Sequence, residues 1–385
     1  MKAIIASGRW RPKKAYMPTD AENALKRALV GSQCWRDTRF EMKEAPVPAI
    51  EDDEVLVRVK SCGICGSDVH LFEKDKAGYI LFSGLTRLPC IIGHEFSGVV
   101  EEAGEKVVGL KKGDVIASES VMWCGICTQC RSGHPNQCLN IELMGLSRDG
   151  ALAEYVALNQ RYCWKINELR DVYPEKEVFD IGSLIEPVGC AYNGIFVAGR
   201  GITPGATVVV YGLGPIGLGA VALSRAAGAG LIIAFDVNDL RVKIAGEMGA
   251  DYAYNTKKTH QRPSDIVDSL TKGRGADMQV EAAGDAAQTI PQMEAALSPQ
   301  GRIIYLGRSQ AAAQVHLDWF VSGANSIAGA RGHAGYGIFP NIIRLVAGKR
   351  LNLLPMISRR YKFKNALDAI AASAKREGAK IIVNI

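Results

Sequence analysis

The sequence lacks a large excess of charge of either sign. Its 385 residues hold 46 Lys and Arg against 40 Asp and Glu, so the formal net charge of +6 is spread thinly along the chain. Nucleic-acid-binding and membrane-surface proteins concentrate basic residues on one face or in one tail, and this balance argues against both kinds of partner. Long hydrophobic runs are also missing, because no stretch reaches the roughly 20 uncharged apolar residues that span a bilayer. The segment 1–9 holds too short an apolar run for a secretory signal, so we predict a cytoplasmic protein.

The composition is also not that of a disordered chain, because 48% of the residues are hydrophobic and only 22% are charged. A chain of this length predicts two domains, each with a core of its own. Ten cysteines in a long chain without a secretory signal point to metal binding or catalysis and not to a disulfide framework.

The hydrophobic pattern changes near residue 200. In the first half, apolar and polar residues alternate with period two, as in 54–60 and 96–102, which predicts antiparallel strands. Further on, unbroken apolar strands such as 208–211 and 231–235 alternate with helical stretches, which predicts a parallel sheet covered on both faces. We therefore predict an α/β protein with these parts: a β-rich domain over 1–190, a doubly wound domain over 191–327, and a return to the first domain over 328–385.

Four cysteines cluster within a lobe over 120–140. Cys124, Cys127, Cys130 and Cys138 are separated by two, two and seven residues. Two residues between thiolates allow a tight turn that points both sulfurs at one centre, and four thiolates close a tetrahedral zinc shell. A closed shell leaves no position for a substrate, so this zinc is expected to be structural. An iron–sulfur cluster is the alternative, although the spacing differs from both ferredoxin patterns.

A second set of metal-binding residue types is scattered along the chain. Cys65 lies in the run CGICGSDVH, His94 and Glu95 follow a glycine, and Glu186 precedes a proline. A thiolate, an imidazole and one or two carboxylates make a mixed zinc shell with an exchangeable position, as catalysis requires. Each piece is weak alone, and Cys62 with Cys65 also fits a CxxC redox pair. The proline is expected to hold the backbone of Glu186 extended.

A glycine loop follows the apolar strand 208–211 directly. It reads Gly212-Leu213-Gly214-Pro215-Ile216-Gly217 and opens a helix, the context that makes a GxGxxG pattern specific for dinucleotides. The glycines allow a tight turn, close approach of the diphosphate and packing of helix on strand, while the N–H groups at the helix start bind the phosphates. Asp236, at the end of the next strand, would accept both ribose hydroxyls and favour NAD. NADP remains an alternative cofactor, because the Arg241 side chain could pair with its 2′-phosphate.

Together these motifs resemble the zinc-dependent medium-chain dehydrogenase/reductase family over nearly the whole chain. The likeness rests on CGICGSDVH, GHE, the four-cysteine lobe, Glu186-Pro187 before a helix, and GLGPIG with Asp236. It is closer to the polyol and threonine dehydrogenase branch than to ethanol dehydrogenases. The resemblance implies a GroES-like catalytic domain, a Rossmann cofactor domain, two zinc ions per chain and NAD.

The resemblance also implies roles for the scattered residues. Cys65, His94 and Glu186 would surround the catalytic zinc, while Glu95 would alternate between ligand and neighbour. Asp68 would accept the free ring N–H of His94 or cap the helix after Cys65, and both roles are compatible.

A proton must leave when an alcohol is oxidised. By the same resemblance, Ser67 would take it and pass it through the cofactor ribose to His70, which lies three residues later and thus on the same side of a helix. A histidine titrates near neutrality, which suits a proton exit.

The implied activity is NAD-linked oxidation of a secondary hydroxyl on a polyhydroxylated small molecule, a cyclic inosose such as scyllo-inosose. Erythritol, threitol, sorbitol or L-threonine remain alternative substrates. A zinc- and NAD-binding regulator without catalysis is a further alternative, and so is a zinc-independent reductase, which would lack the pair Cys65 and His94. Apolar residues around the lobe predict a protein–protein contact and hence a homo-oligomer, a tetramer or a dimer: Met122, Trp123, Ile126 and Leu139.

Overall fold

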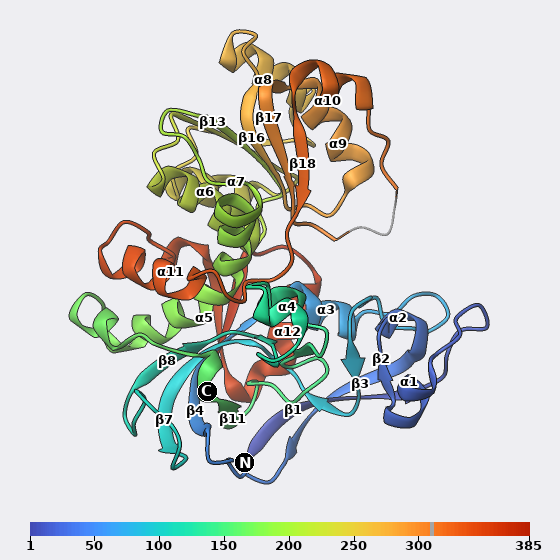
Figure 1. Ribbon diagram of the computed structural model, residues 1–385, viewed down its shortest axis with the longest axis vertical. Helices are drawn as coiled ribbons and strands as arrows, with labels where there is room; N and C mark the ends of the chain where they lie inside the picture. The colour runs from blue at the N-terminus through green and yellow to red at the C-terminus, as the bar shows by residue number, and fades with distance from the viewer. Residues whose placement is uncertain (309–311) are drawn as a thin grey trace. The chain divides into compact units, whose positions relative to one another are not determined.

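The computed structural model describes residues 1–308 and 312–385, which form two compact units (Figure 1). Unit 1 contains Met1–Glu186 and Ile357–Ile385, and unit 2 contains Pro187–Met356. The sequence places the return to the first domain at residue 328, whereas the structure places it at 357. The reason is that the last strand of the parallel sheet and an apolar helix after it stay within unit 2.

Unit 1 is built on a seven-stranded sheet. Its strands run in the order β12-β8-β7-β4-β20-β19, and β11 also pairs with β4. Val55, Val57 and Val59 on β4 are fully buried in the main core, so the alternating run predicted as a strand supplies the centre of the unit. The strand bounds are β4 (Glu54–Ile64), β7 (Glu95–Ala103), β8 (Val115–Ser118), β11 (Tyr155–Asn159), β12 (Cys163–Lys165), β19 (Ile357–Lys362) and β20 (Lys380–Asn384).

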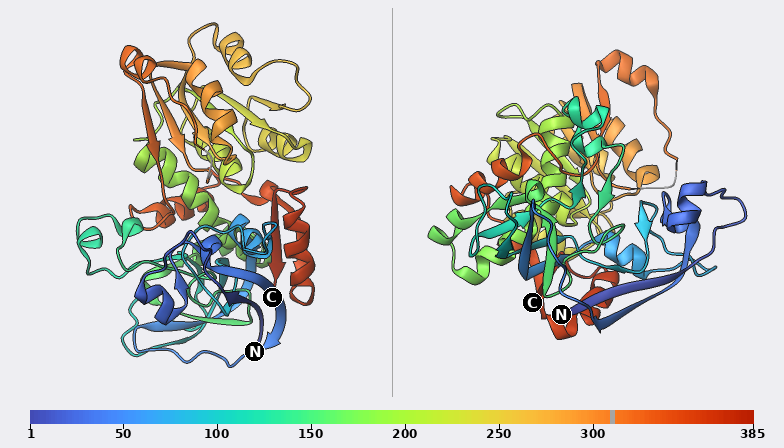
Figure 2. Two further views of the ribbon diagram at one scale, coloured as in Figure 1. Left: turned by 90° about the vertical axis from the view of Figure 1, so that its right-hand side faces the viewer. Right: turned by 60° about the horizontal axis from the view of Figure 1, so that its bottom comes forward.

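Smaller sheets and an N-terminal insertion complete the strands of unit 1. The segment 11–35 holds two short helices and a strand, and its dark blue helices stand at the right-hand edge of the unit in the right view of Figure 2. Its first helix begins at a capping box, in which Thr19 and Glu22 satisfy each other's backbone N–H groups. The elements are β1 (Lys2–Trp10), α1 (Asp20–Leu25), β2 (Arg27–Ala28), α2 (Gly31–Cys34), β3 (Trp35–Glu44), β5 (Thr86–Arg87), β6 (Cys90–Ile91), β9 (Val121–Met122) and β10 (Glu142–Leu143).

Helices pack against the sheet of unit 1, and α3 among them carries candidate site residues. α12 packs against α3 and β20, and α3 follows β4 directly. The bounds are α3 (Gly66–Phe72), α4 (Thr128–Arg131), η1 (Pro135–Gln137), η2 (Gln160–Tyr162), η3 (Asn167–Asp171), α5 (Glu175–Tyr192), η6 (Phe363–Asn365) and α12 (Ala366–Ala374).

Unit 2 is a doubly wound domain with a six-stranded parallel sheet, as the sequence predicts. Its strand order β15-β14-β13-β16-β17-β18 is that of two mononucleotide-binding halves, which meet between β13 and β16. Val208, Val209 and Val210 on β13 are fully buried, because helices cover both faces of the sheet. The strands are β13 (Thr207–Tyr211), β14 (Leu231–Asp236), β15 (Tyr252–Asn255), β16 (Ala276–Glu281), β17 (Leu297–Tyr305) and β18 (Ser326–Gly329).

The helices of unit 2 alternate with its strands. α6 begins at Pro215, directly after the glycine loop. Five buried apolar residues, from Ile338 to Val346, keep α11 within this unit. The bounds are η4 (Asn193–Ala198), α6 (Pro215–Ala226), α7 (Asp239–Glu247), α8 (Pro263–Thr271), α9 (Ala286–Ala295), α10 (Leu317–Gly323), α11 (Ile338–Ala347) and η5 (Leu354–Met356).

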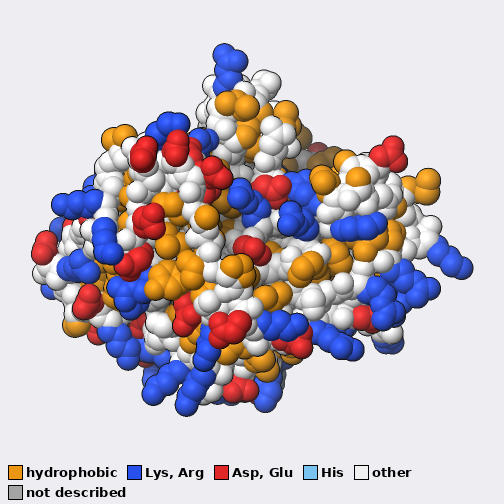
Figure 3. All heavy atoms as spheres, turned by 90° about the horizontal axis from the view of Figure 1, so that it is seen from below, with side chains coloured by type: hydrophobic (Ala, Val, Ile, Leu, Met, Phe, Trp, Pro, Cys, Tyr) orange, Lys and Arg blue, Asp and Glu red, His pale blue; other side chains and the backbone are white. Residues whose placement is uncertain are grey.

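One helical segment of the described chain, Glu175–Ala198, is long and apolar enough to cross a membrane by length and composition. However, 72% of its apolar window is buried inside the protein, as expected for a core helix. The molecular face drawn in Figure 3 carries basic and acidic side chains interspersed with apolar ones.

Candidate functional site

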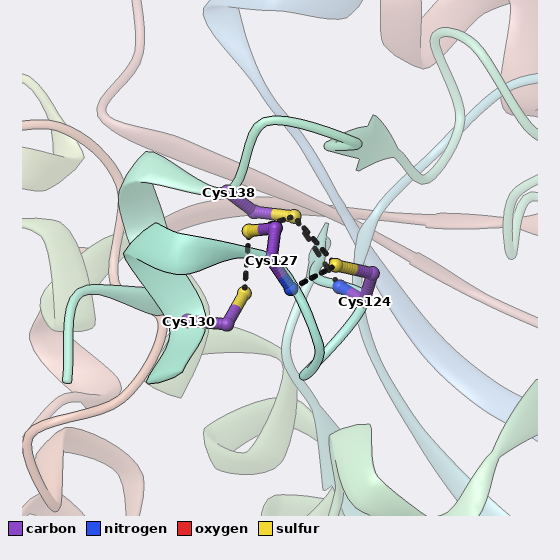
Figure 4. Close-up of side chains that lie close together, drawn as sticks. All are labelled: Cys124, Cys127, Cys130 and Cys138. Atoms are coloured by element: carbon purple, nitrogen blue, oxygen red, sulfur yellow. Dashed lines mark hydrogen bonds between the residues drawn. The ribbon is translucent and has the colours of Figure 1, made fainter. Parts of the chain in front are cut away.

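The four cysteines of the lobe converge on one point (Figure 4). Their sulfur atoms all lie within 4.8 Å of one another, with 3.5 Å between Cys127 and Cys130 and 3.6 Å between Cys138 and Cys124. Cys127 caps the short helix α4, and Gly125 adopts a positive φ of 79°, which allows the tight turn after Cys124.

The geometry of this cluster fits a zinc ion. Four sulfurs at about 2.3 Å from a tetrahedral zinc stand about 3.8 Å apart, close to the observed spacings. A disulfide would need about 2.05 Å, so these thiols are not paired with one another. Backbone N–H groups of Ile126 and Cys127 lower the pKa of Cys124 to about 6, which favours the thiolate that a metal binds. Burial raises the pKa of Cys130 to about 12, so a cation would be needed to hold all four as thiolates.

A second cluster brings together Cys65, His94 and Glu95, whose candidate ligand atoms also lie within 4.8 Å of one another. Cys65 caps the N-terminus of α3, while His94 comes just before β7 and Glu95 is its first residue. His94 and Glu95 are buried at 4% and 1% exposure. One sulfur, one nitrogen and one oxygen donor are a mixed set that suits zinc and leaves room for further ligands.

The two nitrogens of His94 face different groups. Nε2 lies 3.2 Å from the Ser67 hydroxyl, and Nδ1 lies 3.7 Å from Asp68 Oδ1. Both Nδ1 and Asp68 Oδ1 are buried and lack a hydrogen-bond partner among the described residues. A small rotation of the ring would join them and fix the tautomer that binds metal through Nε2. Asp68 also accepts the Cys65 backbone N–H at 2.9 Å, so it performs the capping role that the sequence suggested as its alternative.

Charge around His94 favours its protonated form when no metal is bound. Burial alone would lower the pKa of His94, but the negative charges of Asp68 and Cys65 raise it well above its usual value. A metal would take the place of that proton, because a ligating imidazole is neutral.

Glu186 reaches the same neighbourhood from α5, and its conformation corrects the sequence prediction. Glu186 and Pro187 lie inside the helix, not in an extended segment before one. The helix tolerates the proline because α5 is anchored by burial of Ile185 and Val188 on either side. Ser120 donates a hydrogen bond of 2.7 Å to Glu186 Oε1. The negative charge of Glu186 contributes to raising the pKa of both His94 and Glu95, but Glu186 is not among the three residues whose ligand atoms lie within 4.8 Å of one another.

The sequence did not identify Lys380 as part of this site. Its ammonium is 1% exposed, donates a hydrogen bond to the Glu95 carboxylate and lies 3.1 Å from the Ile64 carbonyl oxygen. Burial raises the pKa of Glu95, although the charge of Lys380 opposes that effect. Nothing in the local sequence signals this pair, because its partners are 285 residues apart.

The remaining sequence candidates in unit 1 lie on or beside α3. Ser67 and His70 are both on this helix, as the sequence predicts. His70 is half-exposed, and its Nδ1 lies 3.3 Å from Glu73 Oε2. Cys62 is fully buried on β4, which raises the pKa of its thiol well above the usual value, and it makes no disulfide with Cys65. Burial of Cys62 therefore argues against a CxxC redox pair.

The glycine loop joins β13 to α6 in unit 2. Gly212 has a φ of +85°, and a Cβ there would lie 2.5 Å from Ala283 Cα. A Cβ on Gly217 would overlap the carbonyl oxygen of Gly212. A Cβ on Gly214, in contrast, would meet nothing within 4 Å, so a phosphate group has space to approach the backbone there. The three glycines thus fit the three requirements of a dinucleotide loop, which are a tight turn, close approach of the diphosphate and packing of the helix on the strand.

Asp236 ends β14 beside this loop. Its Oδ2 accepts the Leu213 backbone N–H at 2.6 Å, and its Oδ1 accepts the Asn238 N–H at 2.9 Å. Arg241 Nη1 lies 3.9 Å from Oδ2. A carboxylate has about four acceptor sites, so Asp236 keeps capacity for ribose hydroxyls while it orders the loop.

Comparison with known proteins identifies the family. Residues 51–168 match the alcohol dehydrogenase GroES-like domain, and residues 215–348 match the zinc-binding dehydrogenase model. A scyllo-inosose 3-dehydrogenase of Thermotoga maritima is 38% identical over 360 residues, covering 90% of this chain and 90% of that protein. The chain belongs to the zinc-binding dehydrogenase family.

Two further comparisons show how far the similarity extends. An L-threonine 3-dehydrogenase of Bacillus subtilis is 33% identical over 343 residues, covering 89% of this chain and 94% of that protein. A solved Thermotoga maritima structure, described as a proposed alcohol dehydrogenase, has 34% identity and a TM-score of 0.96, with 100% of each chain covered. The likeness therefore includes both units of this dehydrogenase.

Proposed function

We propose that the protein is a zinc-dependent, NAD-linked dehydrogenase that oxidises a secondary hydroxyl of a polyhydroxylated small molecule, with scyllo-inosose as the leading substrate. The observation that carries the proposal is the group of half-buried Cys65 and buried His94 and Glu95 in a chain that also contains a dinucleotide-binding unit. Its relatives act on hydroxyl groups, and the scyllo-inosose 3-dehydrogenase covers 90% of this chain.

Each zinc site has its own residues in this proposal. Cys65, His94 and Glu186 would hold the catalytic ion, with Glu95 beside it, and the four cysteines of the lobe would hold a structural ion. Zinc supplies a Lewis acid that makes a hydroxyl more acidic, and NAD accepts a hydride from the carbon. The three anionic side chains weaken that acidity compared with neutral ligands, so oxidation is expected to run best at alkaline pH.

The protein's own side chains would guide the proton that oxidation releases. The Ser67 hydroxyl lies 3.2 Å from His94 Nε2 and is thus beside the proposed ligand atoms. His70, on the same helix, is half-exposed and can exchange a proton with water. Ser67 would take the proton first and His70 would release it to water, and the ribose of a bound cofactor would supply the hydroxyl between them.

NAD is the proposed cofactor because of the charge at the end of β14. The Asp236 carboxylate is buried beside the glycine loop, where it would accept hydrogen bonds from ribose hydroxyls and repel a 2′-phosphate. Gly212, Gly214, Pro215, Ile216 and Gly217 would bind the diphosphate at the start of α6. Arg241 is the side chain that would favour NADP instead, but it already lies 3.9 Å from Asp236.

L-Threonine is the second candidate substrate, favoured by the 33% identity to an L-threonine 3-dehydrogenase. A panel of scyllo-inosose, sorbitol, erythritol and L-threonine with NAD, followed by NADH absorbance on the zinc-replete protein, tests both candidates. We expect turnover of scyllo-inosose at the highest kcat/KM. NADH formation from L-threonine alone would replace the leading substrate, and no NADH from any secondary alcohol would refute the activity.

We also propose that the protein lies in the cytoplasm and that its chains associate into a tetramer or a dimer. Of the four apolar residues named for this contact, Ile126 and Leu139 on the cysteine lobe are 78% and 69% exposed, whereas Met122 is buried, so the proposed contact uses Ile126 and Leu139. Light scattering on the purified protein tests the assembly, and a monomer would contradict it.

A further inference from the structure

A buried ammonium group lies beside the proposed catalytic metal ligands. Lys380 is the first residue of β20, and its side chain is 1% exposed. It donates hydrogen bonds to the Ile64 carbonyl oxygen at 3.1 Å and to Glu95 Oε2. A lysine is rarely buried unless a partner offsets the cost of removing its charge from water, so this position needs an explanation.

The sheet brings the two charges together across a glycine. In unit 1, β4 lies between β20 and β7, with Ile381 opposite Ile64 and Gly63 opposite Glu95. A Cβ on Gly63 would overlap Glu95 Oε2 and would lie 3.4 Å from Lys380 Cδ. Lys380 and Glu95 can therefore meet only because the strand between them has no side chain at this position.

The charge balance indicates what the ammonium does. A divalent zinc with the Cys65 thiolate and the carboxylates of Glu95 and Glu186 would leave one negative charge in excess. Lys380 supplies the compensating positive charge and competes with the metal for the same carboxylate. If Lys380 were absent, the buried Glu95 carboxylate would have the metal as its nearest cation, because an unpaired buried charge is costly.

We propose that Lys380 is a positioning residue that holds the Glu95 carboxylate away from the catalytic metal and so keeps one coordination position exchangeable. This inference rests on the proposed function, because it assigns Lys380 a part in opening the metal to the substrate hydroxyl. It predicts that removing the ammonium changes the ligand exchange of the metal, and not only the stability of the sheet.

The test uses Co²⁺ in place of the catalytic zinc, since its visible absorption reports coordination, and imidazole as an added ligand for the exchangeable position. Lys380→Met should weaken imidazole binding at least tenfold and change the visible spectrum before imidazole is added. Lys380→Arg, which restores the charge, should stay within about threefold of the unaltered protein. Lys362→Met on the neighbouring strand β19, where the side chain is exposed, is the matched control.

Two further variants separate positioning from folding. Lys380→Met combined with Glu95→Gln should recover imidazole affinity, because the carboxylate that would close the exchangeable position is then gone. Gly63→Ala should weaken imidazole binding in the same direction as Lys380→Met by displacing the Glu95 carboxylate. Gly246→Ala, where an added Cβ meets nothing within 4 Å, is its control.

Two outcomes would overturn the inference. One is a Lys380→Met protein that binds imidazole within twofold of the unaltered protein, and the other is a double variant as weak as Lys380→Met alone. NADH formation by the unaltered protein is measured in parallel. If it binds Co²⁺ and imidazole but oxidises no alcohol in the panel, the proposed activity fails and the role of Lys380 stands.

Discussion

The Asp236 carboxylate accepts a 2.6 Å hydrogen bond from the Leu213 backbone N–H, and this bond ties the end of β14 to the glycine loop. One carboxylate thus orders the loop and, in our proposal, discriminates between cofactors. Both roles depend on its negative charge, because charge-assisted hydrogen bonds are roughly twice as strong as neutral ones.

Replacing Asp236 by Asn removes the charge and keeps the shape. We expect the ratio of kcat/KM for NAD over NADP to fall about tenfold or more, equivalent to about 1.4 kcal/mol. The measurement is steady-state kinetics with each cofactor. A general disturbance of the loop would lower kcat/KM for NAD and for NADP alike, so it would leave their ratio unchanged. Asp239→Asn is the control, because Asp239 is exposed and paired with Lys258. An unchanged ratio in Asp236→Asn would remove the ribose assignment.

Gly217→Ala tests the close packing of the loop. The added methyl group would overlap the Gly212 carbonyl oxygen, so the loop must shift where the diphosphate is expected. We expect NAD affinity to fall at least about tenfold by fluorescence titration. Gly246→Ala, with open space around it, should leave the affinity unchanged. Equal NAD affinity in Gly217→Ala would show that the cofactor binds elsewhere.

Cys130→Ser tests whether the cysteine lobe holds a metal. The serine hydroxyl is a poor zinc ligand, so metal analysis should fall from about two zinc ions per chain to about one. The melting temperature should fall with it, because a structural metal contributes to folding. Cys163→Ser, which changes a cysteine outside both clusters, should retain two zinc ions per chain. A single zinc in the unaltered protein would remove one of the two proposed sites.

Glu22→Gln tests the N-terminal insertion through pH. Burial alone would raise the pKa of Glu22, but hydrogen bonds from the Leu29 and Thr19 N–H groups and from Tyr16 lower it overall. A depressed pKa stabilises the fold at pH above the unfolded value of about 4.3, and this stabilisation is lost as pH falls through the folded value. We expect Glu22→Gln to cost about 1–3 kcal/mol at pH 7.

The difference should shrink as the pH falls below 4. Denaturant unfolding of the two proteins at several pH values measures it, with Asp20→Asn on the exposed side of α1 as the control. If the difference in free energy of unfolding stays constant with pH, the charge of Glu22 does not stabilise the N-terminal insertion.

Sequence reasoning succeeds where the signal is local. The alternating run at 54–60 becomes β4, and the loop from Gly212 to Gly217 joins a strand to a helix, because both depend on neighbouring residues. The convergence of Cys124 and Cys138 follows from spacing for the same reason. Lys380 and Ser120 carry no such signal, since the tertiary fold brings each beside a residue far along the chain.

The helical conformation of Glu186 shows a second limit. A residue before proline favours an extended backbone when its own preference decides. Inside α5, burial of Ile185 and Val188 outweighs that preference, and the carboxylate reaches the site from a helix. The sequence therefore singled out the residue, but local propensity predicted the wrong backbone conformation for it.

The order of the strands along the sequence affects how the protein is made, because β20 follows every strand of unit 2. β20 lies between β4 and β19, so the sheet of unit 1 stays open until residues 380–384 have left the ribosome. Every strand of unit 2 is synthesised before then. A polypeptide stopped just short of Lys380 would display all the recognisable motifs and yet lack the strand that joins β4 to β19 in unit 1.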